Sequence, residues 1–292
     1  MANIRDLRQR ITSVGNIQKI TRAMEMVATT KLRRFQGRTV AAKPYGQELE
    51  KLVQGLSAAV ASEPGAAGNA AVLFQPGAST KPLGILVVGS DRGLCGAYNS
   101  NVFRKVVEMI EQQQGDYVLY VIGRKAQKEA LRRKMNIHAY LEDFDLESSS
   151  FGKAAGIANM LVNDFRLGNL SGVAVCATKF RSMVRYEATS DSFLPIAPAA
   201  EVQASKFTQE PILEPSGPKV LGSLIPRYLE TRIYHALLEA ITSEYASRRF
   251  AMKNATDAAG DMKKDLTRLY NRARQAKITQ EISEIVSGAE AL

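Results

Sequence analysis

Apolar residues recur three and four positions apart over the first part of the chain. One series begins at Ile4, a second begins at Ile17 on a shifted phase, and a third continues beyond Pro44. The three series are Ile4, Leu7, Ile11 and Val14; Ile17, Ile20, Met24 and Val27; and Tyr45, Leu49, Leu52, Leu56 and Ala59. This spacing places the side chains on one helix face and predicts an N-terminal helix over residues 1–62. Pro44 is expected to kink or locally open that helix, and a turn cluster, SEPGAAG, ends it.

A second, longer helical pattern covers residues 219–292. From Arg227 onward the sequence contains no proline, and a helix of that length would extend about 100 Å at 1.5 Å per residue. Its apolar positions alternate in steps of three and four: Met252, Ala255, Ala259, Met262, Leu266, Leu269, Ala273 and Ala276. A sustained alternation of this kind is typical of a coiled coil. We expect the N-terminal helix to be the antiparallel partner.

The last turns carry an apolar stripe that points in a new direction. It runs through Ile278, Ile282, Ile285, Ala289 and Leu292, whereas the preceding stripe would continue onto the polar Gln280, Ser283 and Ser287. One interpretation is that the tip inserts into a cavity of another protein. The other is that the tip packs on the N-terminal helix after a stutter in the repeat. Periodicity alone leaves both open.

The middle of the chain has a different pattern. Short β-branched runs at 83–90, 117–123 and 172–180 read as buried strands, and helical stretches lie near 100–113, 125–134 and 151–165. Alternating strands and helices predict a parallel sheet. The predicted fold is therefore a long antiparallel two-helix coiled coil with an inserted, Rossmann-like α/β domain. The expected parts are the N-terminal helix at 1–62, a linker at 63–82, the α/β domain at 83–208, a Pro-rich connector at 209–218 and the C-terminal helix at 219–292.

Charge separates the ends of the chain from its middle. The net charge is +10, made up of +8 over residues 1–45, −1 over 46–218 and +3 over 219–292. A nucleic acid, an anionic lipid surface or an acidic protein surface is therefore expected against the ends. No apolar run is long enough to cross a bilayer, and the charged start does not fit a secretory signal.

Candidate catalytic chemistry is sparse. The run GSDRGLCGAYN, Gly89 to Asn99, follows the first strand, but its glycines match neither dinucleotide- nor P-loop spacing, so a structural turn is the better interpretation. Cys95 has no identifiable base partner, and the two cysteines and two histidines form no metal-ligand spacing. The basic cluster KLRRF, Lys31 to Phe35, with Arg38 and Lys43, reads either as a phosphate-binding surface or as the solvated face of a coiled coil. Arg248 falls on the seam, where a charge needs a partner.

Three motifs together resemble the gamma subunit of F-type ATP synthases, of the bacterial type. They are IRDLRQRITSVGNIQKITRAMEMVATTKL, SDRGLCGAYN and YNRARQAKITQEISEIVSGAEAL, and they occur in the family's order along the whole chain. The resemblance implies a non-catalytic rotor shaft with no cofactor or metal. One such shaft would stand inside three alpha and three beta subunits and join the epsilon subunit and the c-ring. Rotation of the c-ring, driven by the proton gradient, would then drive ATP synthesis, and hydrolysis would reverse it.

The resemblance also implies roles for single residues. Met24, Arg248, Gln275, Thr279 and Glu281 match family positions that contact the beta subunit, which would supply a carboxylate for Arg248. The apolar bearing tip would consist of Ile278, Ile282, Ile285, Val286 and Ala289. The implied location is peripheral, on the cytoplasmic side of the inner membrane, with membrane contact only through the c-ring and no nucleic acid. Rival hypotheses are a coiled-coil hinge or scaffold that binds nucleic acid, and a small enzyme that uses Cys95.

Overall fold

The computed structural model describes residues 4–61, 72–113, 115–142, 146–196, 214 and 216–290. The chain forms two compact units: unit 1 comprises Met1–Thr30 and Arg248–Leu292, and unit 2 comprises Lys31–Ser247. Residues 63–71 of the expected linker, residues 209–213 and 215 of the expected Pro-rich connector, and the terminal Leu292 lie outside the described residues. In the part of the chain that is described, no helix is both long and apolar enough to cross a membrane.

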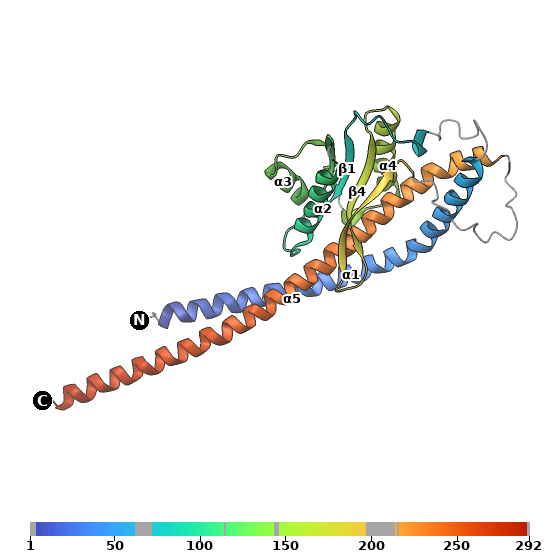
Figure 1. Cartoon of the computed structure of the whole chain (residues 1–292). Helices are drawn as coiled ribbons and strands as arrows, with labels where there is room; N and C mark the ends of the chain where they lie inside the picture. The colour runs from blue at the N-terminus through green and yellow to red at the C-terminus, as the bar shows by residue number, and fades with distance from the viewer. Residues whose placement is uncertain are drawn as a thin grey trace. The chain divides into compact units, whose positions relative to one another are not determined.

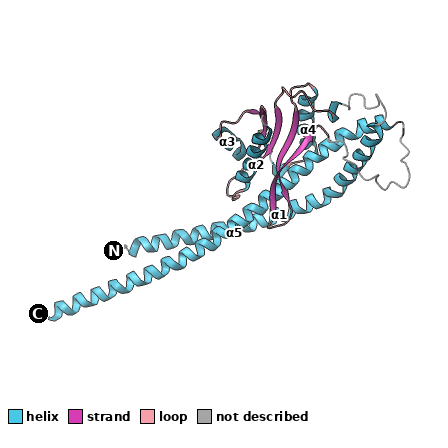
Figure 2. Cartoon of the chain, viewed as in Figure 1, coloured by secondary structure: helices cyan, strands magenta, loops and turns pink. Residues whose placement is uncertain are grey.

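Two long helices account for both ends of the chain. Helix α1 spans Ile4–Ala61 and helix α5 spans Gly217–Glu290 (Figures 1 and 2). Pro44 lies inside α1 without interrupting it, so the expectation of a local opening there is wrong, and α5 likewise contains Pro226. A proline costs a helix interior about 3 kcal/mol. The buried Leu49, Val53 and Leu56 beyond Pro44 provide packing that offsets this cost.

One continuous seam runs along α1 in strict steps of four and three. Its members are buried or half-buried: Leu7, Ile11, Val14, Gln18, Thr21, Glu25 and Ala28 in unit 1, then Leu32, Phe35, Thr39, Ala42, Gly46, Leu49, Val53 and Leu56 in unit 2. The seam keeps its heptad phase through three polar residues instead of shifting onto the apolar series at Ile17. Of the third apolar series, Leu49 and Leu56 lie on the seam, whereas Tyr45 and Leu52 are exposed.

Unit 1 is an antiparallel pair of helices. Thr256 Oγ1 donates to Thr21 Oγ1 at 2.8 Å, Gly260 lies against Gln18, and Gly15 lies against Lys263. The seam of α5 here consists of Met252, Thr256, Ala259, Leu266, Tyr270 and Ala273. Met262 and Leu269, predicted on this seam, are exposed at 56% and 50%. The sequence predicted the repeat of three and four residues correctly. Every second residue of the observed seam, however, lies one position C-terminal to the predicted one.

Unit 2 contains a five-stranded sheet in the order β3-β2-β1-β4-β5. The strands are β1 (Leu83–Val88), β2 (Tyr117–Ile122), β3 (Ile137–Tyr140), β4 (Gly172–Phe180) and β5 (Tyr186–Leu194). Helices α2 (Tyr98–Gln113), α3 (Arg124–Arg132) and α4 (Phe151–Arg166) alternate with them, and a short 3-10 helix, η2 (Leu146–Ser148), precedes α4. The predicted mixture of a coiled coil and an inserted α/β domain is confirmed.

The sheet is mixed, which corrects the prediction of a parallel one. Strands β1, β2, β3 and β4 pair in parallel, whereas β5 pairs antiparallel with β4, with Thr178 opposite Ala188. The sequence analysis did not identify β3 or β5. Strand β3 has only four residues, and β5, YEATSDSFL, is polar because it forms the edge of the sheet. Neither provides the continuous apolar run that marked the three central strands.

Helices cover both faces of the sheet. Alternate residues of β1, β2 and β4 face α2 and α3 in one core that contains Ile85, Val87, Phe103, Leu119 and Cys176. On the other face, Tyr120 of β2 donates from its hydroxyl to Asp164 Oδ2 of α4 at 2.6 Å. Helix α5 approaches the end of β1, because the hydroxyl of the buried Tyr98 reaches the carbonyls of both Val88 and Ala240.

Candidate functional site

In unit 2, the segment Leu237–Ser247 of α5 is enclosed on nearly all sides. Every residue in it except Glu239 is buried, including Thr242, Ser243, Glu244 and Ser247. We call this segment the gripped segment. Thr242 Oγ1 lies 3.0 Å from Thr39 Oγ1 of α1, Ser243 Oγ donates to the Thr178 carbonyl of β4, and Ser247 Oγ donates to the Cys95 carbonyl at 2.6 Å. A helix that is buried all round sits inside a core and does not slide on a surface.

The glycine-rich run after β1 forms part of this enclosure. Asn99 holds the run closed, because its Oδ1 accepts from the Ser90 backbone N–H at 3.0 Å and its amide donates to Ser90 Oγ at 2.7 Å. Leu94 and Gly96 both have positive φ, the backbone conformation of a tight turn. The preferred interpretation of this run as a structural turn is consistent with these contacts.

The usual ligand crevice of an open α/β sheet is filled by the chain itself. Such crevices lie beyond the carboxyl ends of the strands where the strand order reverses, which here is between β1 and β4. The bond from Ser247 to Cys95 and the bond from Tyr98 to Ala240 place α5 against the loop that leaves β1. A nucleotide could not occupy the same space as α5 in this conformation.

Neither cysteine has the surroundings of a nucleophile. Cys95 is buried, and its sulfur lies 3.6 Å from Ser90 Oγ and from the Asn99 amide, neither of which is a general base. Burial raises the pKa of Cys176 to about 12, so its thiol stays protonated. Among the described residues, no group of three or more His, Cys, Asp or Glu side chains is placed to hold a metal ion.

The basic cluster of α1 is largely used within unit 2. Leu32 and Phe35 are buried, Lys31 Nζ lies 2.5 Å from Glu147 Oε2, and Arg38 donates to the Ser149 carbonyl at 3.2 Å. Burial acts to raise the pKa of Glu147, but the hydrogen bonds from Lys31 and Tyr245 outweigh it and leave that pKa below its ordinary value. The other cations of the cluster are exposed, so one part of it makes contacts within unit 2 and the other part forms a solvated helix face.

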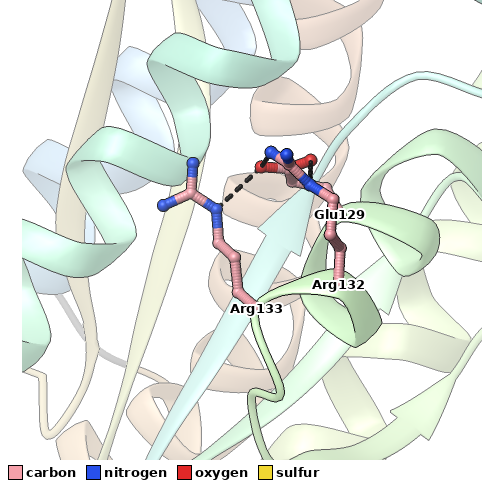
Figure 3. A network of polar contacts seen from close by, with 3 residues as sticks. All are labelled: Glu129, Arg132 and Arg133. Atoms are coloured by element: carbon pink, nitrogen blue, oxygen red, sulfur yellow. Dashed lines mark hydrogen bonds and ion pairs between the residues drawn. The ribbon is translucent and has the colours of Figure 1, made fainter.

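A second basic surface lies on α3. Arg132 and Arg133 both bind Glu129, with nitrogen–oxygen distances of 2.6 and 2.7 Å (Figure 3). These two hydrogen bonds lower the pKa of Glu129 despite some desolvation. Three further exposed cations, Arg124, Lys125 and Lys128, lie on the same short helix. Exposed pairs of this kind contribute at most about 1 kcal/mol each, so α3 is mainly a solvated helix face.

The second apolar series of α1 lies outside the seam. Ile17, Ile20 and Val27 are 52%, 55% and 56% exposed, and Met24 is 40% exposed. The shifted phase of this series in the sequence corresponds to a helix face beside the seam. An exposed stripe of four large apolar side chains on one helix face is typical of a surface that another protein covers.

The tip of α5 extends beyond the described part of α1. Thr21 lies opposite Thr256, and Gln18 lies opposite Gly260. Continued along the two helices, this pairing places Ile4 opposite about Arg274. Beyond that point the tip residues are exposed: Ile278 46%, Ile282 56%, Ile285 72% and Val286 50%, with Ala289 also exposed. Of the two interpretations of the tip, packing on α1 finds no contact among the described residues.

The remaining predicted contact residues also lie in unit 1. Arg248 is half-buried on α5, while Gln275, Thr279 and Glu281 are exposed near the tip. Thr279 donates to the Gln275 carbonyl at 3.0 Å, a bond within the helix, and Glu281 lies 3.5 Å from Lys277. These local contacts leave the exposed side chains of Gln275, Thr279 and Glu281 accessible to a partner. The structure brings the tip residues together on one stretch of helix and places Met24 on the other helix.

The gripped segment and its contacts were not predicted from the sequence. One signal was present: small hydroxyl residues cluster there within an otherwise apolar stretch, as expected where a helix is closely approached by backbone carbonyls. Glu147, which binds both Lys31 and Tyr245, carried no sequence signal at all.

Known proteins match this chain along its full length. The family model described as ATP synthase matches residues 3–292. The ATP synthase gamma chain of Mycobacterium tuberculosis is 40% identical over 314 residues, covering 100% of this chain and 98% of its own. That of Mycobacterium leprae is 41% identical over 302 residues with the same coverage.

Solved structures share the fold. A chain of the Euglena gracilis mitochondrial ATP synthase (OSCP/F1/c-ring) has a TM-score of 0.67 at 17% identity, with 99% of this chain and 94% of that chain covered. A chain of the central stalk and c-ring of the Tetrahymena thermophila enzyme has a TM-score of 0.58 at 22% identity, with 81% and 99% covered. The full-length family match and the 40% identity are decisive. This chain belongs to the ATP synthase gamma-chain family.

Proposed function

We propose that the chain is the central rotor shaft of an F-type ATP synthase. The observation that carries the proposal is the tip of α5, whose apolar side chains are 46% to 72% exposed beyond the described end of α1. A solvated helix end rarely keeps four large apolar residues unless a partner covers them. A cavity formed by other chains, into which the tip inserts, explains why these apolar side chains are exposed in the single chain.

The shaft works by transmitting rotation rather than by catalysing a reaction. Its partners are three alpha and three beta subunits, the epsilon subunit and the c-ring. Rotation of the c-ring, driven by the proton gradient, turns the shaft. Because a two-helix rod with one longer helix is asymmetric, each beta subunit meets a different face in turn. The catalytic sites belong to the partners, and the chain contributes no catalytic residue, which is consistent with the enclosed loop after β1.

Specific residues of unit 1 make the contacts with beta. Met24 and its exposed neighbours on α1 present an apolar surface, and Arg248, Gln275, Thr279 and Glu281 present polar groups on α5. Ile278, Ile282, Ile285, Val286 and Ala289 form the bearing. Apolar contact suits a bearing because it is not directional, whereas fixed ion pairs would resist rotation.

The chain is a peripheral subunit on the cytoplasmic side of the inner membrane, and its only membrane contact is through the c-ring. Membership of the ATP synthase gamma-chain family supports this location. The nucleic-acid alternative is set aside, because Lys31 and Arg38 of the basic cluster bind within unit 2.

The direct test is purification from membranes through a tag on this chain. We expect alpha and beta to co-purify in the ratio of one shaft to three of each, together with the c-ring. A preparation free of alpha and beta would overturn the proposal. Removing the tip from Ile278 onward should leave that ratio unchanged but lower the load against which the rotor turns. Loss of the whole complex on this truncation would contradict the bearing role of the tip.

A further inference from the structure

One carboxylate in unit 2 joins the α/β domain to both long helices. Glu147 lies in η2, between β3 and α4. Its Oε2 accepts from Lys31 Nζ of α1 at 2.5 Å, and its Oε1 accepts from the Tyr245 hydroxyl of α5. Lys31 Nζ also donates to the Tyr245 hydroxyl at 3.2 Å. Three elements that are distant in sequence therefore meet in one triangle of polar contacts, which we call the pin.

Aromatic packing surrounds the pin. The rings of Phe35 and Tyr245 stack with centroids 5.6 Å apart and an interplanar angle of 13°, and Phe35 is fully buried. Lys31 Nζ lies 5.4 Å from the centroid of the Tyr245 ring. Close by, Arg38 of α1 donates to the Ser149 carbonyl, just after η2. The Tyr245 side chain is thus held by stacking on Phe35 of α1 and by a charge-assisted hydrogen bond that its hydroxyl donates to Glu147 of η2.

On both helices, the pin lies at or close to the residue where unit 2 ends. Lys31 is the first residue of unit 2, and Tyr245 lies two residues before its last, Ser247. Both helices continue without a break from these residues into unit 1. Any rotation of α1 or α5 about its own axis, relative to the α/β domain, must stretch the contacts of Glu147. The side chains of Lys31 and Glu147 are only about a third exposed, so water screens the pair only in part.

We propose that Glu147 is a positioning residue for rotary coupling, which fixes both shaft helices against rotation relative to the α/β domain. The proposal rests on the rotor function proposed above. The pin acts where torque passes between the α/β domain and the two helices. Removing it leaves a shaft that assembles but twists further under the same load, so part of each rotation is lost as elastic motion.

The test uses the assembled complex with a probe on the α/β domain. A cysteine introduced by Lys128→Cys on the exposed face of α3 accepts the probe, and the native Cys95 and Cys176 are buried and react slowly. With the catalytic head immobilised and ATP turnover stopped, the angular fluctuation of the probe reports the stiffness of the shaft. Glu147→Gln keeps the shape and an acceptor for Tyr245 but removes the negative charge. The matched control is Glu108→Gln, which breaks the ion pair with Lys105 at 2.9 Å within α2.

We expect Glu147→Gln to widen the angular distribution beyond that of the control, and to lower the protons pumped per ATP hydrolysed while the hydrolysis rate is kept. Amide hydrogen exchange of residues 146–151 should accelerate about fivefold, the factor that corresponds to about 1 kcal/mol for a partly exposed ion pair. If Glu147→Gln does not assemble, Tyr245→Phe removes a single hydroxyl and should show the same changes at smaller amplitude.

Equal angular distributions for the pin variants and Glu108→Gln would overturn the proposal, even if the variants were less stable. The failure of the rotor function would look different. In that case the probe on the unmodified chain would stay still while ATP is hydrolysed, or the chain would not co-purify with the catalytic subunits at all.

Discussion

The close approach of α1 and α5 in unit 2 is tested most sharply at Gly46. A Cβ added to this glycine would lie 2.8 Å from Nε2 and 2.9 Å from Cε1 of His235, well inside the ordinary contact distance of about 3.5 Å. The ring cannot retreat freely, because His235 is half-buried and its ring lies edge-on to the adjacent Tyr234 ring. Gly46→Ala should therefore force the two helices apart or displace the ring.

Two effects of opposite sign determine the size of the change. Overpacking costs about 1–3 kcal/mol, whereas replacing a helical glycine by alanine gains about 0.5–1 kcal/mol. The net expectation for Gly46→Ala is a loss of about 1–2 kcal/mol. Gly37, nine residues earlier in the same helix, has no atom within 4 Å of an added Cβ, so Gly37→Ala should gain the helical term alone. The two variants should differ by about 2 kcal/mol.

The assay is urea unfolding of the purified chain, followed by far-ultraviolet circular dichroism. Both variants lose the same glycine flexibility, so the difference between their midpoints reports the contact with His235. We expect the midpoint of Gly37→Ala to rise above that of the unmodified chain and the midpoint of Gly46→Ala to fall below it. A Gly46→Ala midpoint equal to or above that of Gly37→Ala would refute the close packing of the helices at this point.

Three further predictions concern single residues. Met24→Lys places a cation in the exposed apolar stripe, so ATP hydrolysis should persist while proton pumping falls; unchanged pumping in inverted vesicles would contradict this. Burial, followed by the charge of Lys43, holds the pKa of His235 below 6.5. The unfolded chain therefore takes up this proton first, and the free energy of unfolding should fall as the pH drops below 6.5; His235→Gln should make this fall shallower, and identical pH profiles would count against it. Cys95→Ser should leave ATP hydrolysis by the complex nearly unchanged, and a large loss would favour an enzymatic role for Cys95.

The sequence predicted the spacing of the coiled-coil seam, but it predicted only in part which residues lie on the seam. Leu7, Val14, Met252 and Ala259 were placed on the seam correctly because large or small apolar residues stood at the expected steps. In the middle of α1 the seam passes through Gln18, Thr21 and Glu25, while a more apolar stripe lies beside it. Hydrophobicity alone does not identify the seam at such a place, because an exposed stripe can be as apolar as a buried one.

The buried central strands of the α/β domain were predicted from the sequence, whereas the less buried edge strands were not. Strands β1, β2 and β4 are central and apolar, and their expected ranges agree with the structure to within two residues. The antiparallel β5 was missed because an edge strand needs only one covered face, so its sequence alternates with polar residues. Its direction depends on the hairpin that joins it to β4 and cannot be inferred from composition.

The parts of the candidate site also differ in whether the sequence could predict them. The tip was identified because its apolar stripe, from Ile278 to Ala289, disagrees in phase with the seam before it, which is a local property of the sequence. The pin was invisible, because Glu147 stands 116 residues from Lys31 and 98 from Tyr245. Contacts across such separations follow from the tertiary fold, and a single carboxylate in a polar loop gives no sign of them.

Rotation of this chain inside a working complex is the most direct test of the account. A bead attached through Lys128→Cys on α3 should turn in one direction when ATP is supplied to immobilised catalytic subunits, and should stop when ATP is withdrawn. A bead that stays still, or that turns equally in both directions, while the same complex hydrolyses ATP would contradict the assignment of this chain as the shaft.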